Sequence, residues 1–249
     1  GVYMSPKKFS GDQSEIDNKY ADEMKRCKKG SKKHSWIAAV VCLALIVAAA
    51  VSVIDWAQNQ IKLSDRSSNV TVRYISTPSF MQSSSQLVEL TEEELFTSCD
   101  TVIFRGRILN ISNIEISFNG DKDYGAIAEI EVETVYRGSC DIGDTVSVLL
   151  PCPIMEDYWV EDTGTVSVMQ AGMTGIFMPM IYTDTSMHLQ NGAKLALKDI
   201  ADYGFGDGER FAFLVTKNGL VFDRRSYESI SDAATLDEIE NYILNMINR

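Results

Sequence analysis

Histidine is scarce in this chain, and its scarcity limits the chemistry that the chain can support. Among 249 residues only His34 and His188 are histidines, and only His188 follows residue 56. A single histidine cannot supply the ligand set of the usual zinc hydrolases, and no nucleophile and base can be paired around it. We therefore expect no catalytic site, no metal and no cofactor.

Cysteine is also sparse, with Cys27, Cys42, Cys99, Cys140 and Cys152 as the complete set. The last three permit at most one internal disulfide, which excludes a disulfide-built scaffold. The fold must then rest on its apolar core. The expected strands bring Cys99 and Cys140 to the same end of an antiparallel pair. Two alternatives are therefore open: the two cysteines form a disulfide, or both are free thiols.

Positive charge is scarce after residue 56, where 14 Lys and Arg stand against 29 Asp and Glu. The resulting net charge of −15 argues against nucleic acid or anionic lipid as the partner of this part of the chain. Residues 1–35 differ, because nine basic residues there outnumber five acidic ones.

Charge is absent altogether from the 19 residues Trp36 to Ile54. As a helix this run reaches roughly 28 Å, close to the thickness of a bilayer's hydrocarbon core. Trp36 and Trp56 flank it where aromatic rings prefer the headgroup level, and a basic cluster precedes it. The cluster consists of Lys25, Arg26, Lys28, Lys29, Lys32 and Lys33. We predict one transmembrane helix at 36–56 in the cell membrane, with the N-terminus cytoplasmic and the C-terminal domain extracytoplasmic.

Two other interpretations of the apolar run are open. Ala48-Ala49-Ala50 offers the small residues of a cleavage site, as in a secretory signal, although the run continues to Ile54. A buried soluble helix would normally show a polar stripe, and this run has none.

The predicted organisation has four parts. Residues 1–35 form a cytoplasmic basic segment, in which apolar residues at helical spacing indicate a short helix or a marginally helical tail. The helix at 36–56 and a Ser-rich stalk at 57–88 follow, with an alternating strand at 70–75 in the stalk. Residues 89–249 form the extracytoplasmic domain, which opens on a capping box made by Thr91 and Glu94.

The extracytoplasmic domain is expected to be mainly β. Alternating apolar residues, polar turns at 119–121 and 217–219 and a bulge at 110–113 place its strands. The expected strands are 102–108, 114–118, 126–133, 145–150, 166–169, 176–182, 211–215 and 220–222. Thr235 and Glu238 begin a C-terminal amphipathic helix. This order predicts an OB-like small barrel closed by the helix.

Two stretches carry a resemblance to a known fold family. Residues 95–108, Leu-Phe-Thr-Ser-Cys-Asp-Thr-Val-Ile-Phe-Arg-Gly-Arg-Ile, resemble the opening of netrin-like, TIMP-like OB-fold modules, where a short helix leads to an Asp-hydrophobic-hydrophobic-x-Gly strand. Residues 130–138 and 143–148 are similar to a second landmark, a valine-rich strand, a basic-Gly turn and a Gly-Asp strand start. The resemblance covers about residues 90–182 and implies the fold. The protease inhibition of TIMPs needs a free N-terminal cysteine, so that activity is not carried over.

The segment before the apolar run resembles single-pass, anti-sigma-like envelope proteins of Gram-positive bacteria. There, as in 16–20 and 32–36 here, a short acidic-aromatic helix and a basic run precede the anchor. The zinc-type anti-sigma domain needs a His-x3-Cys-x2-Cys cluster, whereas this chain has only Cys27 and His34 in that region. The resemblance implies a cytoplasmic regulatory protein as partner.

Three local patterns are candidate binding sites. Tyr158 and Trp159 lie among acidic residues and could contact a glycan or a cationic ligand, or fold back onto the barrel. The run Asn119, Asp121, Asp123 lacks the glycine and glutamate of an EF-hand loop and favours a plain polar turn. Residues 204–208 are glycine-rich without the Lys-Ser/Thr of a phosphate-binding loop, which favours a flexible loop.

Together these patterns predict a membrane-anchored, non-enzymatic protein whose extracytoplasmic domain binds or senses an unidentified ligand and whose basic segment is coupled to a cytoplasmic regulator. The alternative is a structural or adhesive cell-surface module without a signalling role.

Overall fold

A computed structural model describes residues 40, 41, 44, 59–65, 69–78, 87–155 and 161–248. The chain divides into two compact units, Gly1–Gln58 and Asn59–Arg249. In the first unit only Val40, Val41 and Ala44 are described, and they are helical and exposed. The predicted span at 36–56 otherwise lies outside the described residues. Among those that are described, no helix has the length and apolarity needed to cross a membrane.

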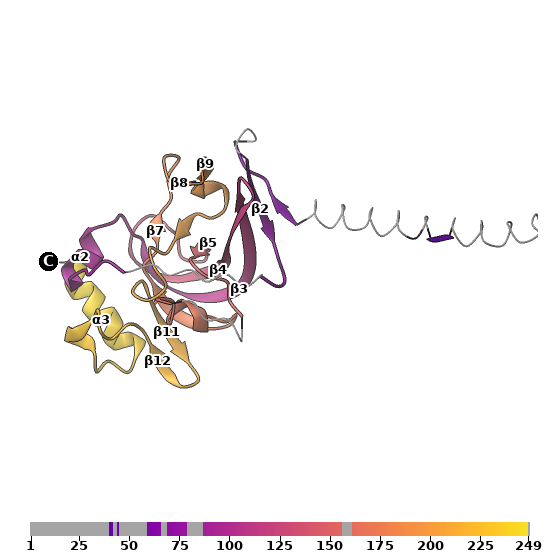
Figure 1. Ribbon diagram of the computed structural model, residues 1–249. Coiled ribbons are helices and arrows are strands. Elements are labelled where there is room, and N and C mark those ends of the chain that lie inside the picture. The colour runs from indigo at the N-terminus through magenta and orange to yellow at the C-terminus, as the bar shows by residue number, and fades with distance from the viewer. Residues whose placement is uncertain are drawn as a thin grey trace, which may run out of the picture. The chain divides into compact units, whose positions relative to one another are not determined.

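The second unit is mainly β, and its large sheet curves into a half-barrel (Figure 1). The strand order is β12-β11-β6-β3-β4-β5-β10-β7, and β2 with β1 joins the sheet at β3. The strands are β1 Gln60–Ile61, β2 Val70–Tyr74, β3 Ile103–Phe118, β4 Asp121–Arg137, β5 Thr145–Leu150, β6 Thr174–Phe177, β7 Met180–Ile181, β10 Tyr203–Gly204, β11 Ala212–Thr216 and β12 Gly219–Val221. A separate hairpin consists of β8 Met187–Gln190 and β9 Ala193–Ala196.

The longest strands, β3 and β4, form one antiparallel hairpin that organises the unit. Its turn is at Asn119 and Gly120, which both have positive φ, as the polar turn predicted. Three register shifts bend the pair, the last of them between Ile108 and Asn110, at the edge of the predicted bulge. The same edge of β3 pairs with β6 near the strand's start and with β2 near its end.

Charged side chains line the outer face of this hairpin. Arg107 pairs with Glu131 at 2.6 Å, and Arg105 lies 4.0 Å from Glu133. Arg105 also reaches Asp237 at 3.5 Å, which connects the hairpin to the C-terminal helix.

Two helices cover one end of the half-barrel. Both predicted capping boxes are present, Thr91 with Glu94 before α2 (Glu92–Thr97) and Thr235 with Glu238 before α3 (Leu236–Ile247). Helix α3 packs against β6 and β11 and touches α2, with Ile239 and Ile243 fully buried. The main hydrophobic core lies between these helices and the half-barrel.

Two predicted strands were wrong or incomplete. Residues 166–168 form a 3-10 helix, η1 (Val166–Val168), in which the backbone N–H of Met169 donates to the carbonyl oxygen of Val166 three residues before it, at 3.0 Å. The expected strand 176–182 is divided into β6 and β7, and Pro179, which has no N–H to donate, lies between them. Two further 3-10 turns are η2 (Leu197–Asp199) and η3 (Glu228–Ile230).

The described part of the expected stalk belongs to the sheet. Strand β2 occupies the predicted position and pairs with β3 over its whole length, from Val70 opposite Phe118 to Tyr74 opposite Ile114. Residues from Asn59 onward therefore fall in the same compact unit as the half-barrel.

Candidate functional site

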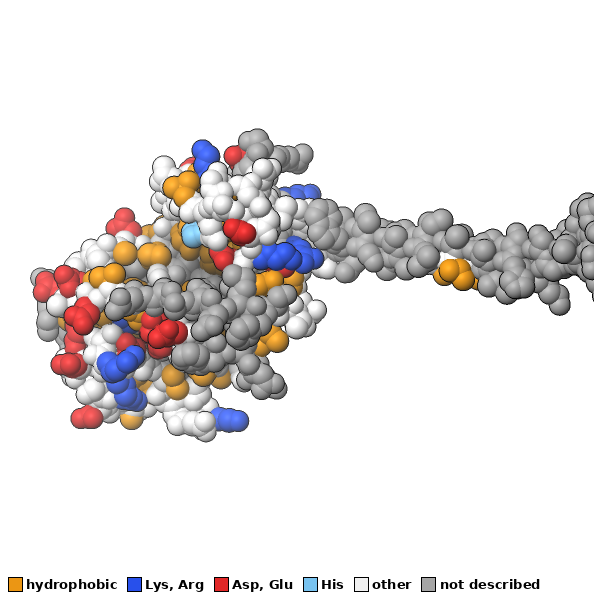
Figure 2. Space-filling view, viewed as in Figure 1, with side chains coloured by type: hydrophobic (Ala, Val, Ile, Leu, Met, Phe, Trp, Pro, Cys, Tyr) orange, Lys and Arg blue, Asp and Glu red, His pale blue; other side chains and the backbone are white. Residues whose placement is uncertain are grey.

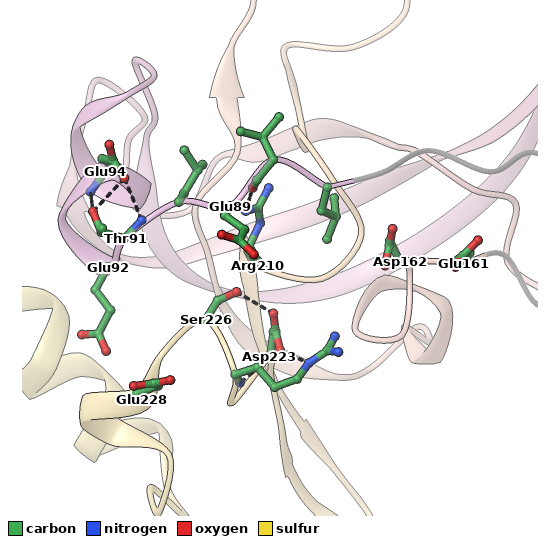
Figure 3. A pocket seen from close by; sticks show the side chains of 14 residues that line it. Glu89, Thr91, Glu92, Glu94, Glu161, Asp162, Arg210, Asp223, Ser226 and Glu228 are labelled. Carbon is green, nitrogen blue, oxygen red and sulfur yellow. Dashed lines mark hydrogen bonds and ion pairs between the residues drawn. The ribbon is translucent and has the colours of Figure 1, made fainter.

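An open groove with a volume of about 1160 Å³ lies beside α2 (Figure 3). Three segments line it: 87–94, which leads into α2, 223–228, which follows β12, and the pair Glu161 and Asp162. Acidic side chains gather at the end of the unit where α2 lies (Figure 2). Seven carboxylates and two guanidinium groups, those of Arg210 and Arg225, line the groove, so its lining is net acidic.

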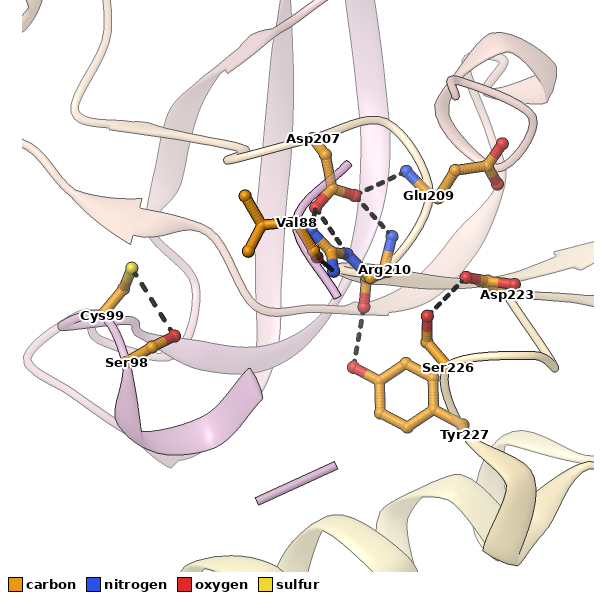
Figure 4. Close-up of polar contacts among 9 residues, drawn as sticks. All are labelled: Val88, Ser98, Cys99, Asp207, Glu209, Arg210, Asp223, Ser226 and Tyr227. Atoms are coloured by element: carbon orange, nitrogen blue, oxygen red, sulfur yellow. Dashed lines mark hydrogen bonds and ion pairs between the residues drawn. The ribbon is translucent and has the colours of Figure 1, made fainter. Parts of the chain in front are cut away.

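Arg210 lines the groove and connects Val88, in the segment before α2, to Asp207 in the glycine-rich segment (Figure 4). Its guanidinium pairs with the carboxylate of Asp207 at 2.8 Å, and both side chains are less than a tenth exposed. A further guanidinium nitrogen, Nη1, donates to the carbonyl oxygen of Val88 at 2.7 Å. Because a buried charge is costly unless it is paired and hydrogen-bonded, this arrangement fixes segment 87–90 against the half-barrel.

Tyr227 secures Arg210 from the other side. The Tyr227 hydroxyl is fully buried and donates to the Arg210 carbonyl oxygen at 2.7 Å. Burial raises the pKa of Tyr227 well above its usual value, so the hydroxyl stays a donor at any physiological pH. Its ring packs on Phe213, with 5.0 Å between centroids.

Some carboxylates of the groove are already engaged. Glu92 accepts hydrogen bonds from Ser229 and Tyr242. Asp223 accepts from Ser226 at 2.7 Å. The backbone N–H and hydroxyl of Thr91 bond to Glu94 and lower the pKa of that carboxyl. These side chains build the walls.

Four other carboxylates of the groove have no hydrogen-bond or ion-pair partner among the described residues. They belong to Glu89, Glu161, Asp162 and Glu228. Like charges left unpaired around one opening create a negative potential that attracts cations.

A recess of about 610 Å³ adjoins the groove and shares Leu87, Val88 and Arg210 with it. Its walls are mostly apolar, and the carboxylates of Asp123, Glu161, Asp162 and Asp207 also line it. The apolar wall residues include Ile116, Phe118, Leu149, Leu150, Pro151, Pro153, Leu195, Leu197 and Phe205.

Tyr182 is the polar group that stands out in the recess. Its side chain is only 8 % exposed, and within the described part of the chain its hydroxyl has no hydrogen-bond partner. Burial raises the pKa of Tyr182 to about 12, so it stays protonated at neutral pH. The protonated hydroxyl can therefore donate a hydrogen bond to a ligand in the recess.

The glycine-rich segment 204–208 borders this site, and after Gly204 it is a loop, as expected, with two closely packed glycines. Gly204 is in β10, and a Cβ there would collide with the hydroxyl of Tyr182. A Cβ on Gly208 would stand 2.6 Å from the Cα of Thr163. These glycines are needed for close packing, which composition alone does not distinguish from flexibility.

The three cysteines of the second unit are free thiols in the structure, with Cys99 exposed and Cys140 and Cys152 buried. Burial raises the pKa of Cys140, and it raises that of Cys152 to about 11 despite a hydrogen bond with Thr163. Cys99 contacts the hydroxyl of Ser98 at 3.9 Å (Figure 4). The pairing of Cys99 with Cys140 stays a prediction for oxidising conditions.

Several other predicted site residues cannot be assigned to the groove or to any other part of the structure. Tyr158 and Trp159, the basic cluster Lys25 to Lys33, and the flanking Trp36 and Trp56 lie outside the described residues. Asn119 and Asp121 connect the β3–β4 turn to the β8–β9 turn through Asn191, which donates to Asp121 at 2.8 Å. Nowhere in the described ranges do three His, Cys, Asp or Glu side chains group as metal ligands.

Comparison of the chain with protein-family models, with curated proteins and with solved structures found no match. The groove therefore has to be interpreted from its own geometry. The pair of Asp207 and Arg210 was missed in the sequence, where the only signal was three charged residues, Asp207, Glu209 and Arg210, in a glycine-rich stretch.

Proposed function

We propose that residues 59–249 form an extracytoplasmic, non-enzymatic binding domain of a single-pass membrane protein. The observation that carries the proposal is the continuous site made by the acidic groove and the apolar recess on either side of Arg210. Ligand sites are typically concave and mostly apolar, with a few polar groups that fix orientation.

The fold we propose is OB-like. The support is a curved sheet built on a long bent hairpin, a short helix before its first strand and a terminal helix over one end. The resemblance of residues 90–182 to netrin-like modules agrees with this order. OB-type barrels bind extended ligands on one face.

The ligand we propose carries an apolar group and at least one positive charge. An apolar group fits the recess beside Phe205, and the hydroxyl of Tyr182 supplies a hydrogen bond there. The free carboxylates of the groove, Glu89 and Glu228 among them, attract the charge.

A calorimetric titration of the full chain in detergent tests this ligand class. The probe is the tripeptide amide Lys-Trp-Lys, and its matched opposite is Glu-Trp-Glu. We expect the basic peptide to bind, to weaken as salt rises, and the acidic peptide not to bind. Equal binding of the two peptides, or binding of neither, contradicts the proposed ligand class.

The anchor at 36–56 and its orientation are supported by the charge-free run and the basic cluster before it. A membrane-impermeant maleimide tests them on intact cells, because Cys99 is exposed. We expect labelling of Cys99 without permeabilisation, lost in Cys99→Ser. Labelling of Cys99 only after permeabilisation overturns the orientation.

Coupling to a cytoplasmic regulator is the least supported part and rests on residues 1–35. Deletion of residues 1–24 should remove a cytoplasmic partner from pull-downs. An unchanged set of partners favours the adhesive or structural alternative.

A further inference from the structure

Strands β1 and β2, here called the latch, join the large sheet only through the second half of β3. Within the sheet β2 pairs only with β1 and with residues 114–118 of β3. Residues 104–107 of β3 pair instead with β6 in the half-barrel. The latch and β6 of the half-barrel therefore pair with different parts of β3.

The latch packs on a hydrophobic core of its own. Val70 and Val72 of β2 join Ile114, Phe118 and the β8–β9 hairpin in a cluster that is separate from the main core. The complete second core consists of Val70, Val72, Ile114, Phe118, Ile127, Ala193, Leu195 and Ile200. Separate clusters favour separate cooperative units, because each loses its burial independently.

One carboxylate fastens the latch to the hairpin. Glu115 of β3 is only 9 % exposed at its side chain and bonds to Arg73 of β2 at 2.9 Å. From β4, Lys122 bonds to it at 3.0 Å and the hydroxyl of Tyr124 at 3.3 Å. A second fastening is Asp199, which accepts from the backbone N–H and hydroxyl of Ser64 at 2.8 Å each.

We propose that the latch opens as a unit while the half-barrel stays folded, and that Glu115 sets how often it opens. Opening would release the chain from residue 60 to residue 74, at most about 50 Å of extended backbone. Because residues 60–74 closely follow the segment proposed as the anchor, opening of the latch would lengthen the connection between the anchor and the binding domain.

The ligand site bears on the same equilibrium. Phe118 and Leu195 line the recess and also belong to the second core. A ligand in the recess would thus favour the closed latch, because it binds the packed form of these side chains. This part rests on the proposed function, whereas the separate opening does not.

Hydrogen exchange of the full chain in detergent, followed by mass spectrometry, tests the proposal. We expect peptides of β1 and β2 to be less protected than peptides covering 103–107 and 174–177. Glu115→Gln should speed exchange in β2 about tenfold and leave 174–177 unchanged, since a buried charge partner is lost only in the latch. Val72→Ala should also speed exchange in β2, because it removes buried apolar contacts from the second core.

Glu131→Gln is the matched control, because it breaks an exposed ion pair on the same two strands outside the second core. Equal protection of latch and half-barrel, or an equal response of both to Glu115→Gln, overturns the proposal. Adding Lys-Trp-Lys amide should slow exchange in β2. If calorimetry shows no binding of the peptide, the ligand class fails, while the ligand-free comparison still decides whether the latch opens separately.

Discussion

Arg210 donates a hydrogen bond to the carbonyl oxygen of Val88 across 122 positions of sequence, at 2.7 Å. The same guanidinium pairs with Asp207, so one buried cation connects the segment before α2 to the glycine-rich segment. The geometry of the proposed site depends on this contact.

Arg210→Met should therefore be strongly destabilising. Removing one partner of a buried ion pair leaves Asp207 uncompensated, at a cost of about 3–5 kcal/mol. The loss of stability is measured as the change in the free energy of unfolding in urea. Arg107→Met is the control, because its pair with Glu131 is exposed and contributes roughly 0–1 kcal/mol. Similar losses for the two variants would contradict the role given to Arg210.

Gly204→Ala should destabilise the domain by about 1–3 kcal/mol, because the new methyl group meets the hydroxyl of Tyr182 in a packed interior. Gly206→Ala, in the same segment, should cost less, since its Cβ would stand 3.3 Å from the ring of Phe211. Thermal unfolding of the two variants gives the comparison. If Gly206→Ala lowered the unfolding temperature more than Gly204→Ala, segment 204–208 would not be packed as described.

The thiols should react in a fixed order. In the reduced chain at pH 8, Cys99 is exposed, whereas Cys152 is buried with a pKa of about 11 and has little thiolate. Alkylation followed by mass spectrometry should modify Cys99 first and Cys140 and Cys152 only after unfolding. Protection of Cys99 that is lost on adding reductant would instead reveal the disulfide with Cys140.

Glu115 should make stability depend on pH. Desolvation works against its charged form, but hydrogen bonds from Arg73 and Lys122 outweigh that effect and lower its pKa. Because the pKa of Glu115 is lower in the folded chain, its charged form stabilises the fold at pH values above the unfolded pKa of about 4.3. This stabilisation is lost as the pH falls through the pKa of the folded chain. The stability difference between wild type and Glu115→Gln should be full at pH 7 and shrink below pH 4. A difference that does not change with pH would contradict this.

The sequence predicted what local patterns determine. The capping boxes at Thr91 and Thr235 and the turn at Asn119 follow from residue types a few positions apart. The bond from Arg210 to Val88 and the second core depend on contacts between distant segments, which no local pattern encodes. The apolar run at 176–182 misled the strand prediction because it continues through Pro179, where the structure interrupts the strand.

The most direct test of the binding site is the affinity of Lys-Trp-Lys amide for two matched double variants. Glu89→Gln with Glu228→Gln removes two free carboxylates of the groove, and Glu129→Gln with Asp232→Asn removes two exposed carboxylates elsewhere. We predict that the first pair weakens binding about fivefold, from roughly 0.5 kcal/mol per exposed charge, and that the second leaves it unchanged. Equal weakening by both pairs would show that the peptide responds to net charge alone, and the groove would not be the site.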